Sequence, residues 1–416
     1  MNGRISRTLR AVGVGTVVLA GLAASDTARA QIVIARSSVN VGGGEDGPEA
    51  PVTRRGVQRY GEILGLDKDQ QDAIAQLFEG YLAAYKANAT GMEKAFQAAN
   101  EKVQESGDFK SMGAEMRKIG KEWMGKMSAL DDGFMGDVKS LLTDEQLERW
   151  PVLERFRRRE QGLRGGVVAG SGLDVLETVR ALESGLETSP GVKDSLAAYE
   201  AEIDGILREN ESLGRRLLDS DTLDFDPTNL EASLKKMEEQ MKKVKDHSRA
   251  VRDVNRKHAR LVSSTLPENV RPRFDEEVRK RWFPSVYRTS GVDRALDAAE
   301  GLSDLTPDQK QQLKAVRQGY AQNRGPLDKS WAEAIERSDE RDDSPFQISF
   351  GEDPTKKPDP LREARKARRE LDEQTKQRVL AVLTPDQKGR MPEDKSNEGE
   401  GEFGENIRVN FRRSGG

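Results

Sequence analysis

Leu305-Thr306-Pro307-Asp308-Gln309 is the stretch that best indicates how this chain folds. A threonine followed three residues later by a glutamine forms a capping box, in which each side chain bonds the backbone N–H of the other residue at the start of a helix. Proline and aspartate suit the first helical turn, and the preceding leucine is the apolar residue that fixes the entry of the chain. The stretch therefore predicts a helix that begins after Thr306.

The same Leu-Thr-x-x-Gln motif occurs at two other places, and a variant at 66–70 has aspartate, another good capping residue, in place of threonine. Helix capping accounts for both the threonine and the glutamine, so we prefer a structural role for them over direct contact with a partner. The motif residues are Leu142, Thr143, Gln146, Leu305, Thr306, Gln309, Leu383, Thr384 and Gln387.

The recurrence of the motifs divides the chain into three tandem units. Unit 1 covers 51–162, unit 2 covers 172–288 and unit 3 covers 291–393. Unit 2 has a degenerate motif, because its counterparts at Leu186 and Leu266 keep the leucine but not the threonine and glutamine together.

Apolar residues within the units recur at steps of three and four, which is the pattern of an amphipathic helix. In unit 1 one such stripe runs through 74–85 and a second through 116–141. Each unit is therefore expected to be a pair of long helices with a coiled-coil-like seam. The predicted fold class is all-α, built from tandem extended helical hairpins.

Segments outside the units carry other signals. The glycine-rich stretch at 163–171 predicts a flexible linker, 31–50 a flexible N-terminal segment and 394–416 a disordered tail. Residues 1–30 have the arginines, short apolar stretch and small-residue cleavage site of a signal peptide. We expect a periplasmic or secreted protein without stable membrane insertion after cleavage; an uncleaved membrane anchor is the alternative.

The composition argues against several classes of protein. The chain has no cysteine and only two histidines, so disulfides, cysteine lipidation and Ser-His nucleophilic sites lack their residues. His247 and His258 would lie ~16 Å apart along one helix, too far to share an ion, and a packed, hydrogen-bonded role is favoured for His258. We predict no catalytic, cofactor-binding or metal site. A net charge of −4 in 416 residues indicates no nucleic-acid partner.

Arginines beside aromatic residues are the remaining candidates for binding. They form either a solvated helix face, with cations favoured near helix C-termini, or a surface that attracts acidic or unfolded protein segments. The candidate protein-binding residues are Trp150, Arg155, Phe156, Arg158, Arg159, Arg281, Trp282 and Phe283.

The motifs also carry a family resemblance. Segments such as SLLTDEQLERW and LSDLTPDQKQQL are similar to the Spy/CpxP-like LTxxQ-motif family of periplasmic proteins, and the resemblance covers most of the chain as three units. It implies small helical subunits that form cradle-shaped antiparallel dimers and act as ATP-independent chaperones or envelope-stress sensors. This chain departs from the family by linking three hairpins covalently.

The resemblance therefore predicts an exported, non-enzymatic binding protein whose partners are polypeptide clients. The alternative is a structural or stress-sensing envelope protein that docks on one fixed protein partner. Two arrangements remain open: hairpins that pack within one chain, and hairpins that pack across two copies in a homo-oligomer.

Overall fold

The computed structural model describes residues 50–392, apart from 107–108, 165, 184, 220–229 and 342–358. Every regular element within these residues is helical and none is a strand, which confirms the predicted all-α class. The predicted signal peptide and disordered tail lie outside the described residues. None of the described helices combines the length and the apolar character that crossing a lipid bilayer requires.

Unit 1 contains helices α1 (Arg54–Leu64), α2 (Lys68–Ser106), α3 (Phe109–Ser140), α4 (Asp144–Leu147) and α5 (Trp150–Gly162). The long helices α2 and α3 pack along each other, and α5 packs back onto α1. Aromatic rings fill the seam, with the centroids of Tyr81 and Phe134 5.1 Å apart. The core of this unit is a cluster of buried residues that extends from Ala50 to Phe156.

Unit 2 repeats the plan with a larger core. Its elements are α6 (Val175–Arg180), η1 (Leu186–Thr188), α7 (Val192–Asp219), α8 (Leu230–Thr265), α9 (Arg271–Trp282) and α10 (Pro284–Tyr287). The helices α7 and α8 form the long pair, and α6 and α9 cover its end. The buried cluster includes Leu186 and Leu266, the two leucines that remain of the motif.

Unit 3 has the smallest core of the three. It contains α11 (Gly291–Glu300), α12 (Pro307–Glu340), α13 (Pro360–Val382) and α14 (Pro385–Lys388). The long pair is α12 and α13, and α11 packs on both. Two leucines of the motif, Leu305 and Leu383, belong to its buried cluster.

Each unit begins with a short helix that the sequence patterns did not indicate. Side chains of Thr53, Asp174 and Ser290 cap α1, α6 and α11 respectively. A buried tyrosine on the following long helix faces this start: the Tyr320 hydroxyl lies 2.9 Å from Ser290 Oγ, and Tyr199 accepts a hydrogen bond from Val175 N at 3.4 Å. The tyrosine therefore fixes the short helix to the long pair.

Several described residues of the glycine-rich stretch 163–171, for which a flexible linker was expected, pack against unit 2. Leu163 belongs to the core of unit 2. At Gly170 φ is 78°, and a Cβ there would lie 2.2 Å from the ring of Trp282. Gly170 N donates to Trp282 O at 3.2 Å, and Asn255 Nδ2 donates to Gly170 O at 2.9 Å. The glycine is needed for a left-handed turn and close contact, not for mobility.

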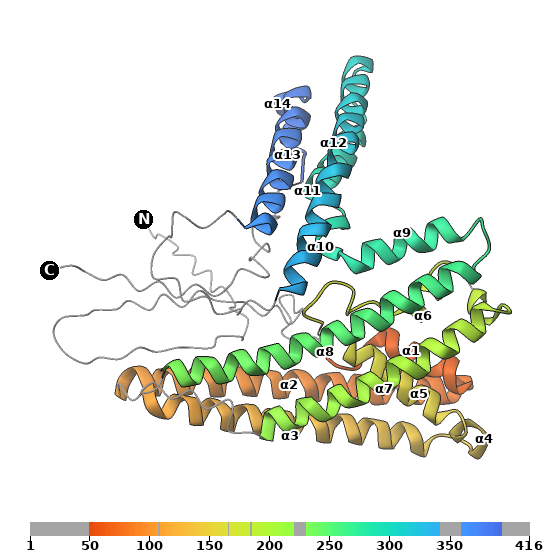
Figure 1. Cartoon of the computed structure of the whole chain (residues 1–416), viewed down its shortest axis with the longest axis vertical. Helices are drawn as coiled ribbons and strands as arrows, with labels where there is room; N and C mark the ends of the chain where they lie inside the picture. The colour runs from red at the N-terminus through yellow and green to blue at the C-terminus, as the bar shows by residue number, and fades with distance from the viewer. Residues whose placement is uncertain are drawn as a thin grey trace, which may run out of the picture.

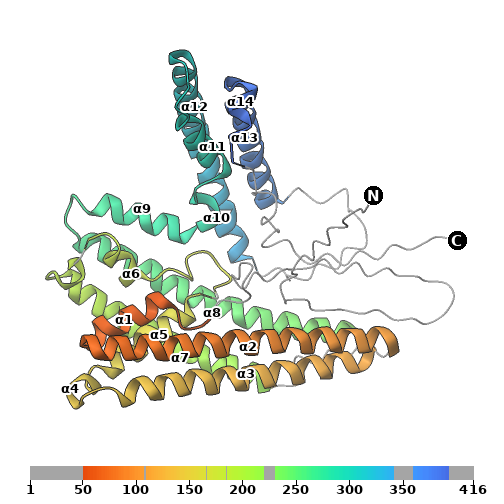
Figure 2. The ribbon, with the colours of Figure 1, turned by 180° about the vertical axis from the view of Figure 1, so that it is seen from behind.

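Units 1 and 2 lie side by side, and unit 3 projects from them. Figure 1 shows α2, α3, α7 and α8 running across the view, with α12 and α13 at a steep angle to them, and Figure 2 shows the same arrangement from behind. Contacts between α5 and α7 join units 1 and 2. We call the described residues of 291–391 the arm, and the described residues of units 1 and 2 the base.

Candidate functional site

The Leu-Thr-x-x-Gln motifs all form capping boxes. The hydroxyls of Thr143, Thr306 and Thr384 accept from the backbone N–H three residues ahead at 3.2 to 3.3 Å. The glutamine side-chain oxygen accepts in return from each threonine N–H at 3.0 Å. At the variant motif, Asp67 Oδ1 accepts from Gln70 N at 2.8 Å. The motifs therefore start helices as their residue types require.

In unit 1 the two motifs also meet each other. Gln70 Nε2 donates to Gln146 Oε1 at 2.8 Å, and Gln146 Nε2 donates to Gln70 Oε1 at 2.8 Å. The second N–H of each amide reaches a backbone carbonyl: Gln70 bonds Leu141 O at 2.8 Å, and Gln146 bonds Gly65 O at 3.1 Å. We call this reciprocal contact the glutamine pair.

Unit 3 contains the same arrangement. Gln309 Nε2 donates to Gln387 Oε1 at 2.8 Å and to Val382 O at 2.9 Å. Gln387 Nε2 donates in turn to Gln309 Oε1 at 3.4 Å and to Asp304 O at 3.3 Å. Gln387 is only 3% exposed, so a lost partner would leave a buried amide without its hydrogen bond.

The geometry of the pair favours a structural role. Each oxygen accepts from its own capping residue and from the partner glutamine, and each nitrogen donates to the partner and to a carbonyl. An amide used in this way has little hydrogen-bonding capacity left for a ligand. The pair instead joins the start of the first long helix to the end of the second. The sequence signal for the pair is the occurrence of two motifs in each of units 1 and 3, whose glutamines lie 76 and 78 residues apart.

In unit 2 a different polar network joins the long helices. Tyr199 is fully buried, and its hydroxyl lies 3.2 Å from Asn255 Oδ1 on α8. Burial raises the pKa of this hydroxyl well above its usual value. Asn255 continues the network to Gly170. A tyrosine–asparagine network inside a large apolar core thus connects the long helices of unit 2.

The structure does not bring the candidate protein-binding residues together on an exposed surface. Phe156 and Trp282 are 6% and 7% exposed because their rings pack in the cores of units 1 and 2. The half-buried members of the set include Trp150, Arg155, Arg281 and Phe283. Of these, Trp150 packs at the edge of the unit 1 core and Phe283 at the edge of the unit 2 core.

Two arginines of that set join units 1 and 2. Arg159 on α5 is 1% exposed and bonds Glu200 at 2.6 Å and Asp174 at 3.4 Å. Burial opposes its charge, but the two carboxylates outweigh this effect and raise the pKa of the guanidinium. Arg158 bonds Asp204 on α7 at 2.9 Å. Sequence patterns did not reveal these pairs, because the carboxylates belong to the next unit.

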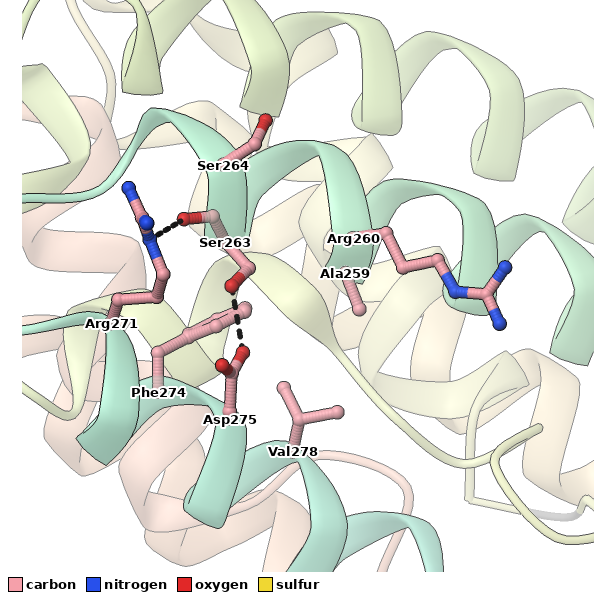
Figure 3. A pocket seen from close by; sticks show the side chains of 8 residues that line it. All are labelled: Ala259, Arg260, Ser263, Ser264, Arg271, Phe274, Asp275 and Val278. Carbon is pink, nitrogen blue, oxygen red and sulfur yellow. Dashed lines mark hydrogen bonds between the residues drawn. The ribbon is translucent and has the colours of Figure 1, made fainter. Parts of the chain in front are cut away.

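The described residues offer little else for chemistry. They contain no group of three or more histidine and acidic side chains placed to hold a metal ion. His258 is 2% exposed and bonds Glu202 at 2.8 Å, beside the ring of Tyr199. A shallow, open groove of about 440 Å³ lies between α8 and α9, with Phe274 at its floor and Arg260 at its side (Figure 3). Ser263 and Asp275, which line it, bond each other at 2.7 Å.

Comparisons of the chain with models of known protein families, with curated proteins and with solved structures find no match.

Proposed function

We propose that this chain is an exported, non-enzymatic binding protein that shields non-native polypeptides on its helical surfaces, in the manner of the ATP-independent periplasmic chaperones it resembles. The observation that supports the proposal most directly is the glutamine pair, which appears at the ends of two long helical hairpins. It gives the resembling motifs a shared structural purpose in units 1 and 3. The resulting long helices present much side-chain surface relative to their narrow cores.

The side chains that would contact clients are apolar residues exposed on these helices. Met124 on α3 is 44% exposed, beside the half-buried Trp123 and Met127. Methionine is unbranched and polarisable, so it adapts to partners of different shape. A second residue of comparable exposure, Leu261 at 46%, lies on α8 in unit 2. Separate apolar residues of this kind fit weak contact with varied segments better than one large docking patch.

The test is suppression of aggregation by purified residues 31–416. A reduced or heat-stressed model client is followed by light scattering without ATP, and we expect strong protection at near-equimolar ratio. Met124→Ser and Leu261→Ser are each expected to weaken the protection, and Lys126→Ser, at an exposed polar position on the same helix as Met124, is the control. No protection across several clients would overturn the proposal.

The second candidate is a structural or stress-sensing envelope protein that docks on one fixed protein partner. The packed linker and the buried Arg159 favour it, because they join units 1 and 2 rigidly and so preserve one surface shape. Affinity capture from an envelope extract separates the two candidates. Many weakly bound polypeptides support the chaperone, and a single stoichiometric partner supports the docking protein.

A further inference from the structure

The end of the arm rests on a row of cations on the base. Lys245, Arg249, Arg252 and Arg256 follow one another on α8 at steps of four, three and four residues, which places them on one face of the helix. The last turns of α12, residues 336–341, lie against this row. We call the row and these residues the latch.

Two of the cations bind the C-terminal carbonyls of α12. Arg249 donates to Asp339 O through Nε at 3.0 Å and through Nη2 at 2.6 Å. Lys245 Nζ donates to Ser338 O at 3.4 Å and also bonds Arg341 O. The last carbonyls of a helix have no partner within the helix and carry the negative end of its dipole. Cations of unit 2 thus provide the hydrogen-bond donors that the last carbonyls of α12 lack.

The other two cations bind carboxylates of α12. Arg252 bonds Glu340 at 2.6 Å, and Arg256 bonds Glu336 at 2.9 Å. On the other side of the helix end, Asp339 Oδ2 accepts from Ala169 N at 2.8 Å. The latch therefore combines two ion pairs, five hydrogen bonds to carbonyls and one hydrogen bond to the packed linker.

Apolar contact contributes little to this junction. Among the described residues, the buried clusters of units 2 and 3 share no member. Among the described residues, the buried apolar side chains of these parts that belong to neither cluster include Val168, next to Ala169, and Val286, Ala332 and Ala334. The junction is therefore held mainly by charge.

Water and salt reach the carboxylates of these ion pairs. The side chains of Glu340 and Glu336 are 59% and 46% exposed, whereas that of Arg252 is only 6% exposed. Exposed ion pairs contribute ~0–1 kcal/mol each, and the screening length falls from about 8 Å at physiological ionic strength to about 3 Å at 1 M salt. Units 2 and 3 each keep their own core when the latch opens.

We propose that the latch is a reversible ionic fastening, which holds the arm on the base at low ionic strength and releases it as salt rises. In the open state the arm pivots at α10, and the row of cations on α8 becomes accessible. The helices of both parts persist.

The experiment measures the distance between arm and base in the mature chain, residues 31–416. Because the protein has no cysteine, Ser303→Cys on the arm and Ser264→Cys on α8 provide unique sites for spin labels, both exposed. Between 50 mM and 1 M NaCl we expect the distance distribution to broaden and to shift, with unchanged helicity by circular dichroism. A distribution that stays narrow and constant over this range would overturn the proposal.

Charge reversal gives an independent measurement. Glu336→Lys combined with Glu340→Lys is expected to produce the open distribution at 50 mM NaCl, and Glu276→Lys, which breaks an exposed pair with Lys280 outside the latch, is the control. The exchange of Glu336→Arg with Arg256→Glu keeps one pair with its charges swapped and is expected to restore the closed distribution relative to Glu336→Arg alone. If the variant with both Glu336→Lys and Glu340→Lys keeps the closed distance distribution and its helicity at 50 mM NaCl, the proposal is contradicted.

Discussion

The long helix pairs of units 2 and 3 are held together by different interactions. Among the described residues, the core of unit 2 has more than twice as many buried apolar residues as that of unit 3. Unit 3 instead buries a polar network, in which Arg368 bonds Asp328 at 2.8 Å and the Tyr320 hydroxyl at 2.9 Å. Unit 3 also keeps both motifs and their glutamine pair, whereas unit 2 has lost them.

The contrast indicates when the motif is dispensable. A large apolar core stabilises a helix pair by burial alone, so unit 2 tolerates the loss of two capping boxes and a glutamine pair. Unit 3 has a thin seam, and hydrogen bonds at its end and middle replace part of the missing burial. The effect of a polar substitution should therefore depend on the unit in which it is made. Hydrogen exchange followed by mass spectrometry reports the opening of each unit separately.

Removal of the buried cation in unit 3 should have the largest effect. Arg368→Met leaves Asp328 and Tyr320 buried without the guanidinium, and we expect a loss of about 3 kcal/mol in the unfolding free energy of unit 3. Exchange in α12 and α13 should accelerate while that in α7 and α8 is unchanged. Lys366→Met, an exposed position on the same helix, is the control. If both variants behave alike, the polar network does not hold unit 3.

The corresponding polar group of unit 2 should matter somewhat less. Tyr199→Phe removes a hydroxyl that serves Val175 N and Asn255, and we expect a loss of about 1–3 kcal/mol in unit 2. Tyr287→Phe changes a half-buried ring outside the core clusters and serves as the control. Unchanged exchange in α7 and α8 would show that apolar burial alone sustains unit 2.

The glutamine pair should come next. Gln387→Ala removes the bonds to Thr384 N, Gln309 and Asp304 O, with an expected loss of about 1–2 kcal/mol in unit 3. Asn269→Ala, at the degenerate motif of unit 2, should stay within about 0.5 kcal/mol. A double-mutant cycle with Gln309→Ala isolates the contact itself. Strictly additive losses would mean that the two amides stabilise their own helices and not each other.

Single caps should give the smallest effect. Thr306→Ala is expected to cost about 1 kcal/mol because α12 loses its N-cap. Thr188→Ala is the counterpart in unit 2, where the hydroxyl bonds only Gly185 O at an exposed site, and a change below about 0.5 kcal/mol is expected. Equal losses of unfolding free energy at both positions would show that units 2 and 3 do not differ in how much these threonines stabilise them.

The sequence predicted the helical class and the helix starts, because capping and helical periodicity are local properties. The short helices α1, α6 and α11 were missed, since segments of six to eleven residues make only about two or three helical turns and no Leu-Thr-x-x-Gln motif marks their starts. Arg159 was interpreted as a surface cation because its carboxylate partner Glu200 is distant in sequence. Gly170 was read as a joint for the same reason, since Trp282 lies more than a hundred residues ahead of it. What remained hidden was the pairing of residues from different elements.

The glutamine pairs also determine how the long hairpins respond to tension. In unit 1 Gln70, at the start of α2, bonds Gln146 on α4 and the carbonyl of Leu141 directly after α3. A force applied at these two ends loads the amide contacts first and then separates the helices turn by turn. Contacts that break one after another yield at lower force than contacts sheared together. The helices of a pulled hairpin would thus separate progressively, starting at the end that carries the glutamine pair.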